Sequence, residues 1–418
     1  MAVVRPFKGI RPQKDLIEQV ASLPYDVMNR EEAAKMAEGN PNSFLHVVRS
    51  EMDVPAEMSQ YDEEVYKTAR RNLDKMITDG ILVQDDKPMF YIYRQLMHGR
   101  VQTGLVGCTS IDDYMNDVIK KHEFTRPQKE QDRINNFDYC DANTAPIFLT
   151  YRNNKRITEI INDWIKFHMP EYNFTSDDDF QHIVWAIDNE AVIAELTELF
   201  EKTNYLYIAD GHHRSASSVK VGMKRREQFP NFTGDEEFNF FMSVIFPDED
   251  LFIMDYNRVI KDLNGHTVEG LIAKVEENFK VEQVSNEEPF RPMEKKTFGM
   301  FLNKQWYKLT AKEGIADEND PVARLDVSIL QTNVLDPLLG IDNPRTNTRI
   351  DFVGGIRGLK ELERRCDVDM EIAFSMFPTT MDDLLAIADA GEVMPPKSTW
   401  FEPKLRSGVL VHRLNDDK

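Results

Sequence analysis

The stretch Tyr205-Leu-Tyr-Ile-Ala-Asp210-Gly211-His212-His213-Arg214-Ser215 decides the fold. Residues 205–209 are apolar or aromatic, which predicts a buried strand. Asp210 and Gly211 then turn the chain, and residues 215–229 have a helical composition. A strand over 181–187 and a helix over 190–202, capped by Asp188, precede the stretch. Strand, helix, strand, turn and helix in this order predict an α/β protein.

The pattern on either side of this stretch predicts a mixed α/β or α+β sheet and two domains. Length alone favours two or three domains. We expect a first region with an N-terminal extension over 1–260, and a C-terminal α/β domain over 261–418 that covers a cleft or dimerises. The expected elements are a helix over 57–79, strands over 90–96 and 101–108, a polar segment over 112–136, a hairpin over 297–310 and a helix over 381–390 capped by Thr380.

Composition excludes several classes of protein. Hydrophobic residues at 41% are enough for a large core, and the chain has no apolar run long enough to span a membrane. A net charge of −21 repels a phosphate backbone, so nucleic acid is an unlikely partner. The three cysteines, Cys108, Cys140 and Cys366, lie far apart with no CxxC spacing. With no signal-like N-terminus, this usage predicts a cytoplasmic protein.

The turn at 210–215 has the properties of an anion site. The first amide groups of a helix lack intrahelical acceptors and lie at the positive end of its dipole, so the backbone from Gly211 to Ser215, including His212, is suited to phosphate. His213 and Arg214 add side chains that can grip phosphate oxygens. The alternative is a salt-bridged helix start with Asp210 as its N-cap. Adjacent histidines on one helix disfavour zinc, which prefers an i, i+4 pair.

A second polar cluster occupies residues 120–126. A carboxylate at Glu123, flanked by His122 and Arg126, would stay ionised and could accept a proton from a hydroxyl. The alternative is a solvated charged face. Lys397 and Lys404 are candidate contacts to an anionic ligand, with a rigid surface turn as the alternative, and we place Tyr25 and Asp26 near the same cleft as a hypothesis. No P-loop, Rossmann fingerprint or Gly-x-Ser-x-Gly elbow is present.

Several motifs together resemble the domain-of-unknown-function family 1015 along nearly the whole chain. They are RPFKGI at 5–10, LPYDV at 23–27, HEFT at 122–125, APIF at 145–148, IADGHHR at 208–214, RLDVSIL at 324–330, AIADAGEVMPPKSTW at 386–400 and PK at 403–404.

The central part is also similar to the ParB/sulfiredoxin-like superfamily of nucleotide-phosphate binders. Within it, the free-serine kinases carry D-G-T-H-R and an upstream H-E pair. This chain has Asp210-Gly-His-His-Arg214 and His122-Glu123 in the same order, with His212 at the threonine position and a longer gap between the two motifs.

The resemblance implies a small-molecule phosphotransferase that uses ATP or ADP and Mg²⁺ to make O-phosphoserine from free serine. Under that hypothesis Glu123 is the base, the turn with His213 and Arg214 holds the transferring phosphate, and Asp210 orients the histidine pair or binds Mg²⁺. The alternative is a nucleotide-binding regulatory protein without catalysis. A ParB-type DNA-binding protein is disfavoured by the net charge and by the lack of a basic recognition helix. A homodimer remains an open expectation.

Overall fold

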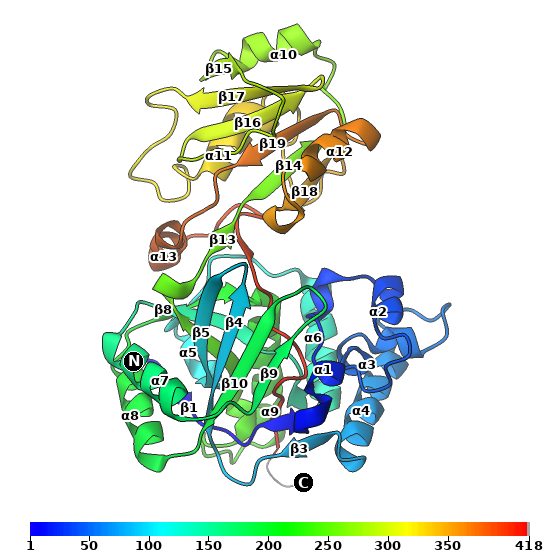
Figure 1. The fold of residues 1–418 in the computed structure, drawn as a ribbon, viewed down its shortest axis with the longest axis vertical. Helices are drawn as coiled ribbons and strands as arrows, with labels where there is room; N and C mark the ends of the chain where they lie inside the picture. Colours follow the sequence, from blue (N-terminus) through cyan, green and yellow to red (C-terminus); the bar gives the residue numbers. More distant parts are fainter. Residues whose placement is uncertain (416–418) are drawn as a thin grey trace. The chain divides into compact units, whose positions relative to one another are not determined.

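The computed structural model describes residues 1–415 of the chain. Its internal contacts divide the chain into two compact units (Figure 1). The first unit is Met1–Leu251 together with the C-terminal segment from Pro403 onward, and the second is Phe252–Glu402. The boundary expected after residue 260 instead falls after 251, and the sequence pattern did not indicate the C-terminal return. Residues 416–418 of the expected second domain lie outside the described part of the chain.

A mixed sheet forms the centre of the first unit, which confirms the predicted fold class. Within residues 1–415 its strands run in the order β6-β11-β8-β12-β5-β4-β10-β9, with β1 paired to β5. The β6–β11 and β8–β12 pairs are parallel and the others are antiparallel. The strands are β1 (Val4–Arg5), β4 (Phe90–Met97), β5 (Arg100–Ser110), β6 (Ile119–Lys120), β8 (Ile147–Tyr151), β9 (Tyr172–Thr175), β10 (Gln181–Ile187), β11 (Leu206–Asp210) and β12 (Phe240–Pro247).

Two amphipathic helices, α7 (Lys155–Phe167) and α8 (Glu190–Glu201), lie side by side against this sheet (Figure 1). Their buried residues, such as Trp164 and Phe200, join one core with strand residues such as Leu149. Asn189, not the expected Asp188, caps α8, because its side chain accepts from the amides of the first turn. Burial of one apolar stripe on each helix holds the pair in place.

A second helical layer contains α6 (Pro127–Cys140) and α9 (His212–Gln228), which pack against each other. The sequence pattern missed α6, which occupies part of the segment expected to be only polar. Its buried residues include Glu130, Arg133 and Asn136, so no apolar stripe marks it. Helix α5 (Ile111–Met115), capped by Ser110, also lies in that segment.

The N-terminal region folds around its own apolar cluster, which includes Phe44, Val47 and Leu73. Helix α4 begins after the capping Asp62, later than the expected start at 57. The elements are β2 (Ile10–Pro12), α1 (Ile17–Val20), α2 (Arg30–Met36), α3 (Leu45–Val48), α4 (Glu63–Thr78) and β3 (Leu82–Gln84), with β2 paired to β3.

The C-terminal segment returns to the first unit and adds backbone pairs to distant parts of it. Ser407 bridges to Ser22, and Val411 bridges to Ile10. Strand β21 (His412–Arg413) pairs with β7 (Ala142–Asn143). One segment of the chain therefore joins the N-terminal region to the residues that lead into β8.

The second unit has its own antiparallel sheet, in the order β15-β17-β16-β19-β14-β18 within the described residues. The expected hairpin at 297–310 and the Thr380 cap are both confirmed. Strand β13 (Ile253–Met254) enters this unit and pairs with β20 (Trp400–Phe401), which leaves it. Its other elements are β14 (Tyr256–Ile260), α10 (Val268–Val275), β15 (Phe279–Gln283), β16 (Thr297–Leu302), β17 (Gln305–Ala311), α11 (Asp326–Leu330), a π-turn (Gln331–Leu335), β18 (Ile350–Gly354), α12 (Lys360–Val368), β19 (Ile372–Met376) and α13 (Met381–Asp389).

No helix of the described residues is long and apolar enough to cross a bilayer.

Asp326 makes the stability of the second unit depend on pH. Burial raises the pKa of this carboxyl to about 7, although it accepts the amide hydrogen of Lys296. The folded chain thus keeps a proton that the unfolded chain releases near pH 4. Between pH 5 and 8 we expect the wild type to lose roughly 2–3 kcal/mol of unfolding free energy relative to Asp326→Asn, measured by denaturant titration.

The matched control is Asp320→Asn, because Asp320 caps a turn at the surface through the amides of Val322 and Ala323. Its difference from the wild type should not change between pH 5 and 8. Parallel pH profiles for the wild type and Asp326→Asn would contradict the prediction.

Candidate functional site

Gly211 allows the chain to pass directly from β11 into α9. Its φ of +99° lies in the left-handed region, and a Cβ there would stand 3.0 Å from Nε of Arg214. Helix α9 begins at His212, earlier than the expected 215, and Gly211 rather than Asp210 occupies its N-cap. Ser215 is fully buried, and its hydroxyl and amide both donate to the carbonyl of Gly211. These two hydrogen bonds fix the conformation of the turn at the start of α9.

Asp210, the last residue of β11, is held by two cations. Its Oδ2 lies 3.1 Å from Nζ of Lys404 and 3.6 Å from a terminal nitrogen of Arg214. Burial alone would raise the pKa of Asp210, but the two cations outweigh it and hold that pKa well below its usual range. The structure thus brings Lys404 to the predicted site from 194 residues away.

Arg214 is almost completely buried. One terminal nitrogen donates to the carbonyl of Pro146, the residue before β8, and the other faces Asp210. Its Nε–H is buried without a hydrogen-bond acceptor among the described residues. A buried donor left unpaired costs about 1–3 kcal/mol, so this N–H favours a site that a ligand oxygen completes.

His212 links the start of α9 to the loop that carries Glu123. Its Nε2 accepts from the amide of His122 at 3.4 Å, which assigns the ring proton to Nδ1, and Nδ1 lies 3.7 Å from Oε2 of Glu123. Burial lowers the pKa of His212 to about 3, so the ring is neutral at physiological pH. The side chain of Glu123 is 40% exposed.

His122 is buried edge-to-face against His212, with ring centroids 4.4 Å apart. Burial lowers its pKa well below the usual value, and its Nδ1 has no hydrogen-bond partner among residues 1–415. Together with Nε of Arg214, it gives the site two buried polar atoms that the fold itself does not satisfy.

His213 stabilises the same loop from the other side. Its Nε2 accepts the amide hydrogen of Arg126 at 2.9 Å, so the backbone of Arg126, and not the predicted side chain, makes this contact. Burial lowers the pKa of His213, while the charges of Glu123 and Asp26 oppose that shift. Its Nε2 thus positions the loop, and the contact of His213 with phosphate stays a prediction.

Residues of the LPYDV motif also reach this region. The charge of Arg214 acts on Tyr25 and that of Asp26 on His213, and burial is the main cause that raises the pKa of Tyr25. The guanidinium of Arg133 lies 4.0 Å from the centroid of the Tyr25 ring. The placement of Tyr25 and Asp26 near the cleft is thus supported, whereas no sequence signal pointed to Arg133 because α6 was missed.

Glu130 of α6 is a further residue that the sequence did not single out. It accepts from the hydroxyl of Thr125 at 2.6 Å, pairs with Lys220 of α9, and its carbonyl accepts from Ser217. These bonds fix the end of the loop that carries Glu123. The HEFT motif contains Thr125 and was the available signal.

Lys397 lies in the second unit, where its carbonyl accepts from Arg258 and its ammonium group lies 5.5 Å from the centroid of the Tyr256 ring.

A direct Mg²⁺ site at Asp210 fits these surroundings poorly. The Oδ2 atom is already matched by Lys404 and Arg214, and both would repel a divalent cation. Within the described residues, Asp210 belongs to no cluster of three or more metal-ligating groups.

The fold and the site define a mixed α/β protein with a polar helix N-terminus at the end of β11. The chain belongs to the DUF1015 family, described as protein of unknown function, whose model matches residues 4–328. This confirms the family resemblance seen in the motifs, although the motifs at 386–400 and 403–404 lie beyond the match.

Solved structures show distant similarities. A conserved hypothetical protein from Pyrococcus furiosus is 16% identical, with 70% of this chain and 88% of that chain covered and a TM-score of 0.34. A free serine kinase in complex with AMP is 14% identical, with 70% and 85% covered and a TM-score of 0.35. C-terminally truncated SbnI from Staphylococcus aureus is 11% identical, with 75% and 90% covered and a TM-score of 0.39. No curated protein matches the chain. At these identities and TM-scores the similarities do not extend to function.

Removing the ammonium group of Lys404 should destabilise the first unit. Lys404→Met leaves the Asp210 carboxylate with only the more distant guanidinium of Arg214. We expect a loss of about 1–3 kcal/mol of unfolding free energy in urea titrations, less than for a fully buried pair because Asp210 is partly exposed.

The matched control is Lys202→Met, which removes an exposed i, i+4 pair with Glu198 and should cost about 0.5 kcal/mol or less. Adding Asp210→Asn to Lys404→Met should recover part of the loss. An equal effect of the two lysine substitutions would contradict the assignment of Lys404 as the principal partner of Asp210.

Proposed function

We propose that the first unit binds the phosphates of ATP or ADP at the turn after β11 and transfers a phosphoryl group to the hydroxyl of a small amino acid, free serine in the first instance. The observation that carries this proposal is the meeting of a half-exposed carboxylate, Glu123, with the N-terminus of α9. His212 holds the two elements together through the contacts to His122 and Glu123.

The phosphate position follows from the groups at the start of α9. The amides of His212, His213 and Arg214 have no intrahelical acceptor, because the first bond of the helix runs from the amide of Ser215 to the carbonyl of Gly211, and they can donate to phosphate oxygens. The unpaired Nε–H of Arg214 and the ammonium group of Lys404 add positive potential nearby. Because His212 and His213 are neutral, they contribute position and hydrogen bonds rather than charge.

Glu123 is assigned as the group that receives the proton of the acceptor. The hydroxyl oxygen forms a bond to the transferred phosphorus, the bond from that phosphorus to the bridging oxygen of the nucleotide breaks, and the hydroxyl proton moves to Glu123. The shortened nucleotide leaves with the negative charge, which the helix N-terminus stabilises. In this assignment His212 is a positioning residue, because its Nδ1–H faces the carboxylate of Glu123.

A second candidate is a nucleotide-binding regulatory protein without group transfer. It is favoured by the contacts of Arg214 and His213, because one holds Pro146 and the other holds the loop at Arg126. Because these two residues stabilise the structure around the site, they would maintain a nucleotide-binding site in a protein that is not an enzyme.

Incubation with Mg²⁺, ATP or ADP, and serine, followed by phosphorus NMR, tests the transfer. We expect O-phosphoserine from the wild type and a rate lower by about 10²–10⁴-fold for Glu123→Gln, since general-base catalysis contributes that much. Glu190→Gln, at the exposed start of α8, is the matched control and should keep the wild-type rate.

Nucleotide binding is measured on the same samples by equilibrium dialysis. Nucleotide binding without product from serine, threonine or homoserine would reject the kinase hypothesis and favour the regulatory protein. Product at an unchanged rate in Glu123→Gln would retain the activity and reject the assigned base. Absence of nucleotide binding would reject both candidates.

A further inference from the structure

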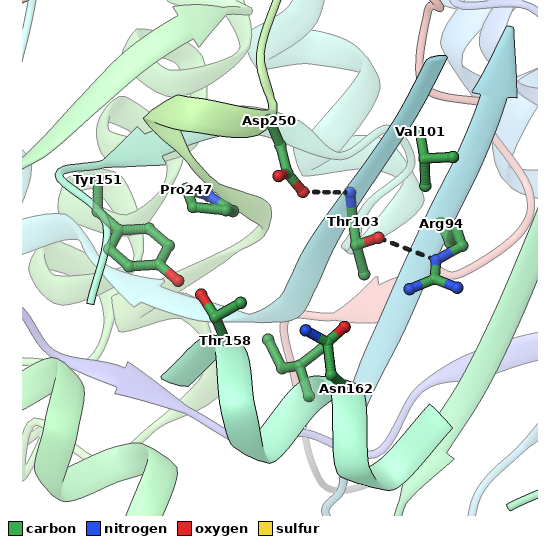
Figure 2. A pocket seen from close by; sticks show the side chains of 9 residues that line it. Arg94, Val101, Thr103, Tyr151, Thr158, Asn162, Pro247 and Asp250 are labelled. Carbon is green, nitrogen blue, oxygen red and sulfur yellow. Dashed lines mark hydrogen bonds between the residues drawn. The ribbon is translucent and has the colours of Figure 1, made fainter. Parts of the chain in front are cut away.

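A cavity of about 190 Å³ lies in the first unit, away from the turn at Gly211 (Figure 2). Tyr151, the last residue of β8, lines the cavity. Arg214, at the turn, contacts Pro146, which lies just before the first residue of β8. A strand rises about 3.3 Å per residue, so roughly 13 Å of β8 separates the two places. The cavity is therefore a site of its own.

Arg94 presents to this cavity a guanidinium without a counter-ion, whose central carbon lies 5.7 Å from the centroid of the Trp185 ring. It lies on β4 opposite Thr103 of β5, and its Nε donates to the Thr103 hydroxyl at 3.0 Å. Its two terminal nitrogens have no hydrogen-bond acceptor among the described residues. Burial lowers the pKa of Arg94, against the opposing charge of Asp250, as expected for a cation without a close counter-ion.

Asp250 supplies a fixed negative charge on the same cavity. Strand β12 ends at Pro247, which has no N–H, so the ladder from β12 to β5 stops beside Thr103. The amide of Thr103 donates instead to Oδ2 of Asp250 at 3.0 Å. Thr103 thus binds Arg94 through its hydroxyl and Asp250 through its amide. Within residues 1–415 neither Arg94 nor Asp250 forms an ion pair.

Neutral polar groups and apolar surface complete the lining. Tyr151, Thr158 and Asn162 line the cavity with polar groups, and Figure 2 shows the Tyr151 hydroxyl and the Asn162 amide on its wall, whereas the Thr158 hydroxyl donates to Oδ1 of Asn153 at 2.9 Å. Apolar contact is available from Val101 and Ile161. An engineered cavity of about 150 Å³ holds benzene, so the volume here is large enough for a small organic molecule of at least that size.

We propose that this cavity binds a small zwitterionic α-amino acid, with its carboxylate on the guanidinium of Arg94 and its ammonium group on the carboxylate of Asp250. A ligand with both charges neutralises both residues at once, whereas a simple anion would leave Asp250 unpaired beside it. Charge-assisted bonds of this kind are the strong ones, and a guanidinium can hold a carboxylate through two parallel bonds. The assignment does not depend on the proposed phosphoryl transfer.

Isothermal titration calorimetry of the full chain with L-alanine, propionate and ethylamine tests the proposal. Alanine has both charges but no hydroxyl to phosphorylate, and the other two ligands each lack one charge. We expect alanine to bind at least about tenfold more tightly than either, the equivalent of losing one charge-assisted contact. Arg94→Gln should weaken the binding of alanine by a similar factor. Asp250→Asn should abolish the preference for alanine over propionate.

Arg100→Gln, on the same hairpin but outside the lining, is the matched control and should bind alanine as the wild type does. Arg94→Lys keeps the charge without the planar fork and should fall between wild type and Arg94→Gln, which separates lost recognition from misfolding. Equal binding of propionate and alanine would overturn the zwitterion assignment. So would an absence of heat with alanine, glycine and serine, or binding that is lost in Arg214→Ala and retained in Arg94→Gln.

Discussion

The ion pair between Lys404 and Asp210 is the constraint on which the rest of the first unit depends. A carboxylate at the end of a buried strand needs a counter-charge, and its nearest one comes from the far end of the chain. Beyond Lys404 the same segment pairs with Ser22, Ile10 and Asn143, and these backbone pairs fix it to the first unit. The N-terminal region, β7 and β11 are thereby all joined to the C-terminal segment, the first two by backbone pairs and the last by the ion pair.

The candidate site is built from neutral histidines and backbone groups more than from free cations. His212 and His213 each accept a backbone amide from the loop at 122–126, and this use of the rings requires them to stay uncharged. The basic residues are already matched, Lys404 and Arg214 by Asp210. A ligand would therefore meet a preorganised set of donors, in which Nε of Arg214 and Nδ1 of His122 still lack partners in the described structure.

The sequence predicted the elements in which apolar residues follow a period, such as β10 and the hairpin of β16 and β17. It missed α6 because the buried face of that helix is polar: Glu130 pairs with Lys220, and Asn136 accepts from Thr144. It singled out Asp210 and Lys404 but gave no reason to pair them, since spacing along the chain says nothing about contacts 194 residues apart. The sequence also did not predict that His212 and His213 are neutral, because burial, which the sequence does not show, decides whether an imidazole carries a charge.

The division of the first unit into two stretches of sequence has a consequence for synthesis of the protein. Residues 252–402 form a unit of their own whose entering and leaving strands, β13 and β20, pair with each other. At about 5–20 residues per second, Lys404 leaves the ribosome roughly 10–40 s after Asp210. During that interval Asp210 has only the more distant Arg214 as a counter-ion, and β7 lacks its partner strand β21. The first unit can therefore be completed only after the whole second unit has been made.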